Sequence, residues 1–106
     1  MTGTSRPAKA LALLGLAQRA GAVVKGTDRV RQAMRRGEVR LVLFAEDGSP
    51  TQQEKVRPLA RVQGIRCVTL ADRGDLGAAV GSGPLATVAV TRRGFADELE
   101  VLLGQD

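Results

Sequence analysis

The feature that most constrains the fold is an apolar run near the middle of the chain, Leu41-Val42-Leu43-Phe44-Ala45. An uninterrupted apolar run of this length is typical of a central strand that is covered on both faces. Helix-like segments with short joints lie on both sides of it, which is the alternation of an α/β domain. Because 106 residues suffice for one modest core but not for two, we expect one domain over residues 1–106.

Turn and capping residues divide the rest of the chain into helices and strands. Thr27 or Asp28 is the expected N-cap of the second helix and Asp72 that of the fourth, while Ser49 opens a capping box. In the third helix, Pro58 predicts a kink or an early end. The expected architecture is a three-layer α/β/α sandwich with a four-stranded mixed sheet. Its strands are predicted at 22–25, 41–45, 67–70 and 86–90, and its five helices at 7–20, 27–36, 50–62, 73–80 and 91–103.

The charges are distributed unevenly along the chain. Sixteen Lys and Arg against eleven Asp and Glu give a net charge of +5. Up to Arg66 there are 13 basic and 5 acidic residues, whereas from Cys67 onward there are 3 basic and 6 acidic ones. Because Lys and Arg displace counterions from phosphates, this excess favours a polyanionic partner that binds the first two-thirds of the chain.

The residue types that are missing exclude several function classes. There is no histidine, which removes the usual routes to zinc binding and to acid–base or nucleophilic catalysis. The one cysteine, Cys67, cannot form an internal disulfide, and we expect it to be a buried core thiol in a reducing cytoplasm. The Leu- and Ala-rich N-terminal stretch is too short to span a bilayer. We therefore expect a cytoplasmic protein that is not an enzyme and that uses no cofactor, metal, membrane or small-molecule substrate.

The most informative stretch is the predicted second helix with its entrance. Val30, Ala33 and Met34 recur at core spacing, so the remaining side chains point outward. At the entrance, Lys25 and Gly26 lie where free backbone N–H groups and the helix dipole favour a phosphate. Spacing alone fits a solvated basic face equally well. The outward rows are Asp28, Arg31 and Arg35, and beside them Arg29, Gln32 and Arg36.

Four motifs in one order resemble the L7Ae family of ribosomal proteins, and the resemblance covers about residues 14–95. They are Lys25-Gly26-Thr27 opening a helix, Arg36-Gly37 ending it, the apolar strand that runs into Ala45-Glu46-Asp47, and Leu76-Gly77-Ala78-Ala79-Val80-Gly81. The resemblance is closest to the short bacterial members that are associated with the ribosome. It implies an α/β/α sandwich that binds kink-turn RNA, with no cofactor.

In that family the glycine and the polar residues of this helix grip the sheared G·A pairs of the kink, and an apolar loop covers unstacked bases. The family's run Gly-Thr-Asn-Glu-x-x-Lys is only partly kept: Asp28 stands in place of Asn, Arg29 in place of Glu and Gln32 in place of Lys. Asp28 cannot donate to a base and Arg29 cannot accept from one. The RNA-binding residues that the resemblance and the helix spacing imply are Lys25, Gly26, Thr27, Asp28, Arg29, Arg31, Gln32, Arg35, Arg36 and Leu85.

Two other patterns are weaker. Glu46-Asp47 after the central strand could bind a metal, as in receiver domains. A receiver domain needs a further acidic pair after its first strand, where this chain has Lys25-Gly26. A helix-capping or loop-ordering role is therefore favoured for Glu46-Asp47. With only Phe44 and Phe95 as aromatics, recognition by base stacking is disfavoured relative to structured RNA read by shape and phosphate. Two hypotheses remain: a monomeric protein that binds structured RNA, with ribosomal RNA the expected partner, and a protein-interaction scaffold that has lost the RNA site.

Overall fold

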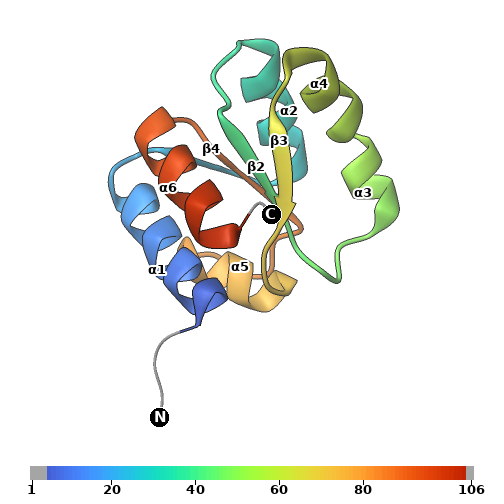
Figure 1. Cartoon of the computed structure of the whole chain (residues 1–106). Helices are drawn as coiled ribbons and strands as arrows, with labels where there is room; N and C mark the ends of the chain where they lie inside the picture. Colours follow the sequence, from blue (N-terminus) through green and yellow to red (C-terminus); the bar gives the residue numbers. More distant parts are fainter. Residues whose placement is uncertain (1–4, 105–106) are drawn as a thin grey trace.

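The computed structural model describes residues 5–104, which form three layers with a mixed sheet in the middle (Figure 1). Helices α1, α5 and α6 cover one face of the sheet, and α2 and α4 cover the other, with α3 packed against α4. This confirms the predicted three-layer α/β/α sandwich. In chain order the elements are α1 (Arg6–Arg19), β1 (Val23–Lys25), α2 (Thr27–Arg35), β2 (Leu41–Phe44), α3 (Pro50–Glu54), α4 (Arg57–Gln63), β3 (Arg66–Thr69), α5 (Arg73–Ala79), β4 (Thr87–Val90) and α6 (Arg93–Leu103).

The sheet has the strand order β1-β4-β2-β3. Strand β4 runs antiparallel to both of its neighbours, with Lys25 beside Val88 and Leu41 beside Val90, whereas β2 and β3 are parallel. The apolar run therefore forms an inner strand, and each of its residues from Leu41 to Phe44 is fully buried, as predicted. Because β1 and β4 are antiparallel, the end of β1 and the start of β4 meet at one edge, and α2 begins there.

Alternate residues of the inner strands serve the two halves of the core. Leu41 and Leu43 point toward α1, α5 and α6, where Leu14, Leu76 and Leu99 pack against them. On the other face, Val42 and Phe44 pack against α2 and α4, and Val30, Ala33 and Met34 of α2 are buried as their spacing predicted. This packing fixes the rotation of α2 about its axis, and so determines which of its side chains face outward.

The segment predicted as a third helix from 50 to 62 is in fact two helices, so residues 5–104 contain six helices rather than five. Helix α3 ends at Glu54, and α4 begins at Arg57 with Pro58 in its first turn. In a continuous helix the ring of Pro58 would collide with the carbonyl of Glu54, four residues earlier, whereas in a first turn its missing N–H costs nothing. The proline was the right signal, but the break comes before it.

Three further predictions about individual side chains need correction. The N-cap of α2 is Gly26, not Thr27 or Asp28, because the Thr27 hydroxyl is engaged with β4 instead. The sequence of α1 predicts an apolar stripe that includes Leu14 and Leu16, but Leu16 is 49% exposed, since it lies about 200° around the helix from the buried Leu14. Cys67 is half-buried rather than fully buried, because β3 is an edge strand; burial still raises the pKa of its thiol.

Two predicted helix caps are confirmed. The side chain of Ser49 accepts a hydrogen bond from the backbone N–H of Gln52 at 3.1 Å, and Asp72 accepts one from Asp75 at 2.8 Å. Within residues 5–104, no helix combines the length and the apolar content that a membrane crossing requires.

Candidate nucleic-acid interface

An open groove lies where α2 begins, and it unites parts of the chain that are far apart in the sequence. Its volume is about 370 Å³. One wall is the entrance of α2, the second is the end of α3, and the third is the loop that leads into β4. The lining residues are Lys25, Gly26, Thr27, Asp28, Arg29, Gln52, Lys55, Pro84, Leu85 and Ala86.

Gly26 turns the chain from β1 into α2. Its φ of +96° lies in the region that side-chain-bearing residues rarely adopt, and a Cβ built on it would meet nothing within 4 Å. The glycine is therefore required by the backbone conformation and leaves open space beside it. No side chain caps this end of α2, so the first amide groups of the helix are available to a ligand in the groove.

Two residues beside Gly26 fix the entrance of α2 to the rest of the domain. The Thr27 hydroxyl donates to the hydroxyl of Thr87, with the oxygens 3.0 Å apart, and the N–H of Gly26 donates to the carbonyl of Thr87 at 2.9 Å. The Lys25 ammonium donates to the carbonyl of Val80 at 3.3 Å. Lys25 was predicted to offer its charge at the helix entrance; it lines the groove, but one of its three donors is held by the end of α5.

The Leu76-Gly77 motif positions the opposite wall of the groove. A Cβ at Gly77 would overlap the carbonyl oxygen of Gly83, so only glycine lets the loop lie this close to α5. The loop is further held because the N–H of Ser82 donates to the carbonyl of Gly77 at 2.9 Å. Pro84 and Leu85 follow directly and reach the groove. The motif therefore determines where the loop sits relative to Gly26.

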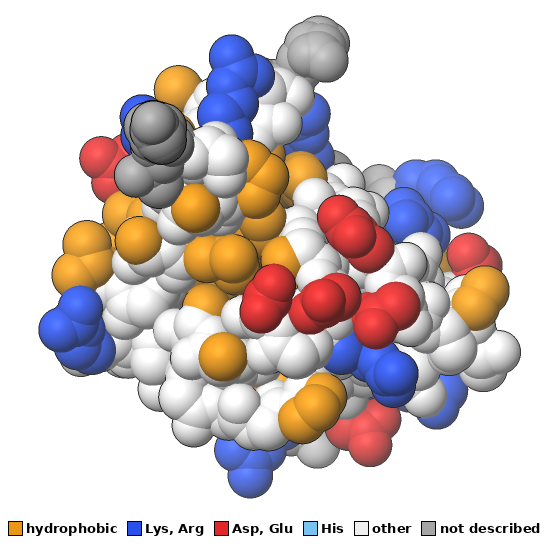
Figure 2. Space-filling view, turned by 90° about the horizontal axis from the view of Figure 1, so that it is seen from below, with side chains coloured by type: hydrophobic (Ala, Val, Ile, Leu, Met, Phe, Trp, Pro, Cys, Tyr) orange, Lys and Arg blue, Asp and Glu red, His pale blue; other side chains and the backbone are white. Residues whose placement is uncertain are grey.

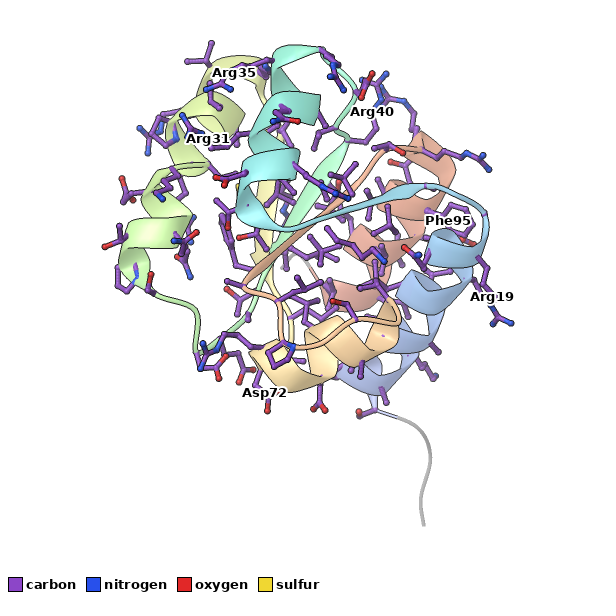
Figure 3. All side chains as sticks on the ribbon, turned by 180° about the vertical axis from the view of Figure 1, so that it is seen from behind. Arg19, Arg31, Arg35, Arg40, Asp72 and Phe95 are labelled. Atoms are coloured by element: carbon purple, nitrogen blue, oxygen red, sulfur yellow. The ribbon has the colours of Figure 1, made fainter. Side chains whose placement is uncertain are left out.

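Three of the predicted cations of α2, Arg31, Arg35 and Arg36, lie outside the groove, whereas Arg29 lines it. Gln32, Arg35 and Arg36 are exposed, as are Asp28 and Arg29 at its start. Arg31 is only half-buried and lies, with Arg35, on the side of α2 that meets α4 (Figure 3). The Nε atom of Arg31 is buried without a hydrogen-bond partner among the described residues. The ten predicted residues thus divide into a groove set and a helix-surface set.

Sequence reasoning missed four residues of the groove. Pro84 and Ala86 flank the predicted Leu85, and their position could have been inferred from it. Gln52 and Lys55 carried no such signal, because nothing in the sequence shows that the short helix α3 reaches the start of α2. They add an amide and a cation to the wall opposite Gly26.

Asp47 and Asp72, two acidic residues that do not line the groove, have structural roles. Asp47 accepts a hydrogen bond from the backbone N–H of Arg73 at 2.8 Å, which confirms the loop-ordering interpretation of Glu46-Asp47. That bond, assisted by the Arg73 guanidinium, holds the pKa of the Asp47 carboxyl below its ordinary value. Asp72 lies at the lower end of the molecule (Figure 3), and the view from below shows acidic side chains gathered there beside an apolar area (Figure 2).

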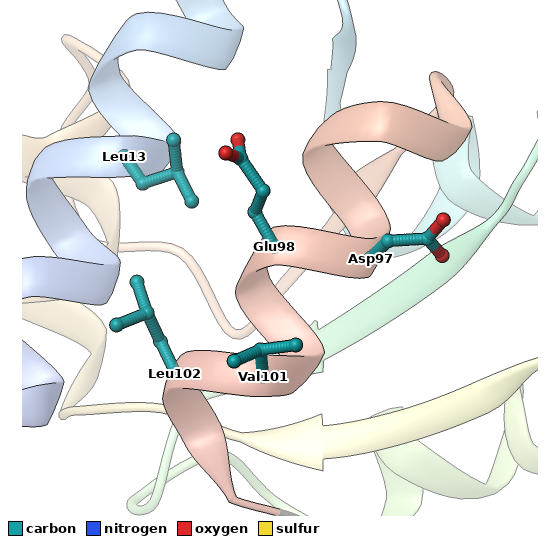
Figure 4. Close-up of a pocket in the computed structure, with 5 residues that line it drawn as sticks. All are labelled: Leu13, Asp97, Glu98, Val101 and Leu102. Carbon is teal, nitrogen blue, oxygen red and sulfur yellow. The ribbon is translucent and has the colours of Figure 1, made fainter.

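A larger hollow, of about 500 Å³, lies between α1 and α6 (Figure 4). Its lining is apolar apart from the two carboxylates of Asp97 and Glu98. None of the predicted RNA-binding residues lines it. An anionic ligand would be repelled there, so this hollow is not a candidate for nucleic acid.

Comparison with known proteins places the chain in a family. The model of the Ribosomal protein L7Ae/L30e/S12e/Gadd45 family matches residues 8–100. The chain belongs to this family. The RNA-binding protein YlxQ of Bacillus subtilis is 38% identical over 91 residues, which are 86% of this chain and 91% of that protein. The large ribosomal subunit protein eL8 of Thermoplasma volcanium is 36% identical over 92 residues, 86% of this chain and 76% of that protein.

Solved structures of this L7Ae-family fold superpose closely on the chain. A Bacillus halodurans protein of unknown function has a TM-score of 0.87 at 30% identity, with 92% of this chain and 98% of that chain covered. The Giardia lamblia 15.5kD RNA binding protein has a TM-score of 0.76 over 96% of this chain and 88% of that one, and at 20% identity it supports the fold alone. The resemblance drawn from the four sequence motifs is thereby confirmed.

Proposed function

We propose that the protein is a non-enzymatic, cytoplasmic RNA-binding protein that associates with the ribosome and recognises structured, kink-turn-like RNA as a monomer. The observation that carries this proposal is the groove at the start of α2, where uncapped amide groups, an unobstructed glycine and the cation Lys55 face one space. The names of the relatives, an RNA-binding protein and a ribosomal protein, support the same partner class.

The two sets of predicted residues suit different parts of an RNA. In the groove, the amides at the entrance of α2 are in position to donate to a phosphate, and the side chains of Asp28 and Gln52 are in position to meet base edges. Outside it, Arg35 and Arg36 extend the positive surface along α2, where they would neutralise phosphates of the adjoining stem. Ribosomal RNA, which is highly structured, is the expected partner.

Recognition by shape fits this interface better than recognition by stacking. Phe44 is fully buried and Phe95 lies on α6, on the other side of the sheet from α2. No aromatic ring is therefore available at the groove, whose apolar contribution comes from Pro84 and Leu85. This arrangement favours a folded RNA with a fixed backbone path.

The interface can be mapped directly by NMR, with ¹⁵N-labelled protein titrated with a kink-turn RNA and with a plain duplex of equal length. We expect the largest amide shifts at Gly26, Thr27, Lys55 and Leu85, and a larger response to the kink-turn RNA. No shifts with either RNA would favour the alternative, a scaffold domain that has kept the fold and lost the RNA site. Shifts centred on α1 and α6 would show that RNA binds elsewhere.

A further inference from the structure

The hollow between α1 and α6 has the properties of a protein-docking groove. Leu13 and Leu102 point into the gap from the two helices, and Glu98 extends from α6 toward α1 (Figure 4). Val101 completes the lining and is 74% exposed. Leu16, one helical turn beyond Leu13 on α1, is itself 49% exposed, so both helices carry uncovered apolar side chains.

A second hollow, of about 580 Å³, lies along α6 and is lined by the same two carboxylates. It is lined by Gly94 and Phe95, together with Arg92, Asp97 and Glu98. Phe95 lies where α6 meets the end of α1 (Figure 3). The two acidic residues therefore line both hollows, and apolar side chains of α6 adjoin them in each one.

We propose that this surface binds a helix of a partner protein that carries an apolar stripe and Lys or Arg residues beside it. A groove between two helices accepts a third helix through its apolar face. The carboxylates of Asp97 and Glu98 would pair with the cations of the incoming helix, and they would repel RNA or an anionic lipid surface. The groove lies on the opposite face of the sheet from α2, so a protein and an RNA could be bound at the same time.

The test uses fluorescence anisotropy with the full chain and three synthetic peptides of about 14 residues. The first is made of Leu and Lys in amphipathic helical order, the second has the same composition in scrambled order, and the third replaces Lys by Glu. We expect the ordered Leu/Lys peptide to bind at least about tenfold more tightly than either of the others.

Variants then locate the binding site. Glu98→Gln and Val101→Ser should each weaken binding of the ordered peptide several-fold, and together by about tenfold or more. The matched controls are Glu54→Gln, an exposed carboxylate on α3, and Val62→Ser, an 86% exposed valine on α4; both should bind the peptide as the unmodified protein does. Because all four side chains are at least partly solvent-exposed, circular dichroism should show each variant folded.

Three results would overturn the proposal. One is equal affinity for the ordered and the scrambled peptides, and another is an equal effect of Glu98→Gln and Glu54→Gln. The third is self-association in sedimentation that Val101→Ser abolishes, because the occupant would then be a second copy of the chain. None of these measurements involves RNA, so they stand or fall independently of the proposed function.

Discussion

The hydroxyl of Thr27 donates a hydrogen bond to the hydroxyl of Thr87, and this bond ties the first residue of α2 to the first residue of β4. Thr87 is completely buried, and its carbonyl also accepts from the N–H of Gly26 at 2.9 Å. The backbone at the entrance of α2 is thus held to the sheet through one buried residue. That connection determines where the uncapped amides of the helix point.

Replacing Thr27 with Val should therefore reduce stability. The variant keeps the shape of the side chain but leaves the buried Thr87 hydroxyl without its partner, which costs about 1–3 kcal/mol. Thr27→Ser, which retains the hydroxyl, should stay close to the unmodified protein. Urea unfolding of the three proteins measures the difference. Equal stability of Thr27→Val and the unmodified protein would mean that the bond contributes nothing.

The contact between α5 and its following loop predicts a contrast between two glycines. Gly77→Ala places a methyl group against the backbone of Gly83, so the loop must shift, at a cost of about 1–3 kcal/mol. Because that loop carries Leu85 into the groove, RNA affinity should fall as well. Gly83→Ala is the matched control, since a Cβ there meets nothing within 4 Å. Thermal unfolding and RNA binding that do not distinguish the two variants would contradict this role of Gly77.

The hydrogen bond from the Arg73 N–H to Asp47 predicts a pH dependence of stability. It holds the pKa of Asp47 in the folded protein below the value of about 3.8 expected in the unfolded chain. Asp47 therefore contributes stability above that value, and the contribution is lost as the pH falls through the folded pKa. Asp47→Asn should be less stable than the unmodified protein at pH 7, and the gap should narrow toward pH 3. Urea unfolding across this range would refute the assignment if the gap stayed constant.

Two departures from the family's usual run predict reduced specificity. Asp28 and Arg29 line the groove. The resemblance to the family implies Asn and Glu at these two positions, with donors and acceptors that match sheared G·A edges. A mismatched polar group costs about 1–3 kcal/mol, roughly a ten- to hundredfold loss of affinity. The double change Asp28→Asn with Arg29→Glu should improve discrimination between a kink-turn RNA and one whose G·A pairs are replaced, although the net charge falls by one. Tight and selective binding by the unmodified protein would overturn this interpretation.

Most of the fold followed from the sequence because its signals are local. The apolar run of β2, the caps at Ser49 and Asp72, and the core spacing of Val30, Ala33 and Met34 each depend on residues within a few positions of one another. Pro58 indicated an interruption of this segment, but the break lies at Lys55 and Val56, because the proline is accommodated in the first turn of α4.

The parts of the site that were missed depend on distant contacts. Thr27 was expected to cap α2, but its hydroxyl bonds to that of Thr87, 60 residues away in the sequence. No local pattern predicts this hydrogen bond. The contributions of Gln52 and Lys55 depend on where α3 packs in the folded domain, which no local sequence pattern specifies. The sequence shows which side chains are suited to RNA, whereas tertiary packing determines which of them share a groove.

The salt dependence of RNA binding tests the proposed α2 surface most directly. Affinity for one kink-turn RNA should be measured over a range of salt concentrations for the unmodified protein and for the double variant Arg35→Ala with Arg36→Ala. The control is the double variant Arg92→Ala with Arg93→Ala, which changes another exposed arginine pair, at the start of α6. Removing a phosphate contact should lower the slope of log affinity against log salt by about 0.7 to 0.9. We expect the α2 pair to lose affinity and slope while the α6 pair keeps both. If the α2 pair leaves affinity and slope unchanged, RNA does not bind this surface.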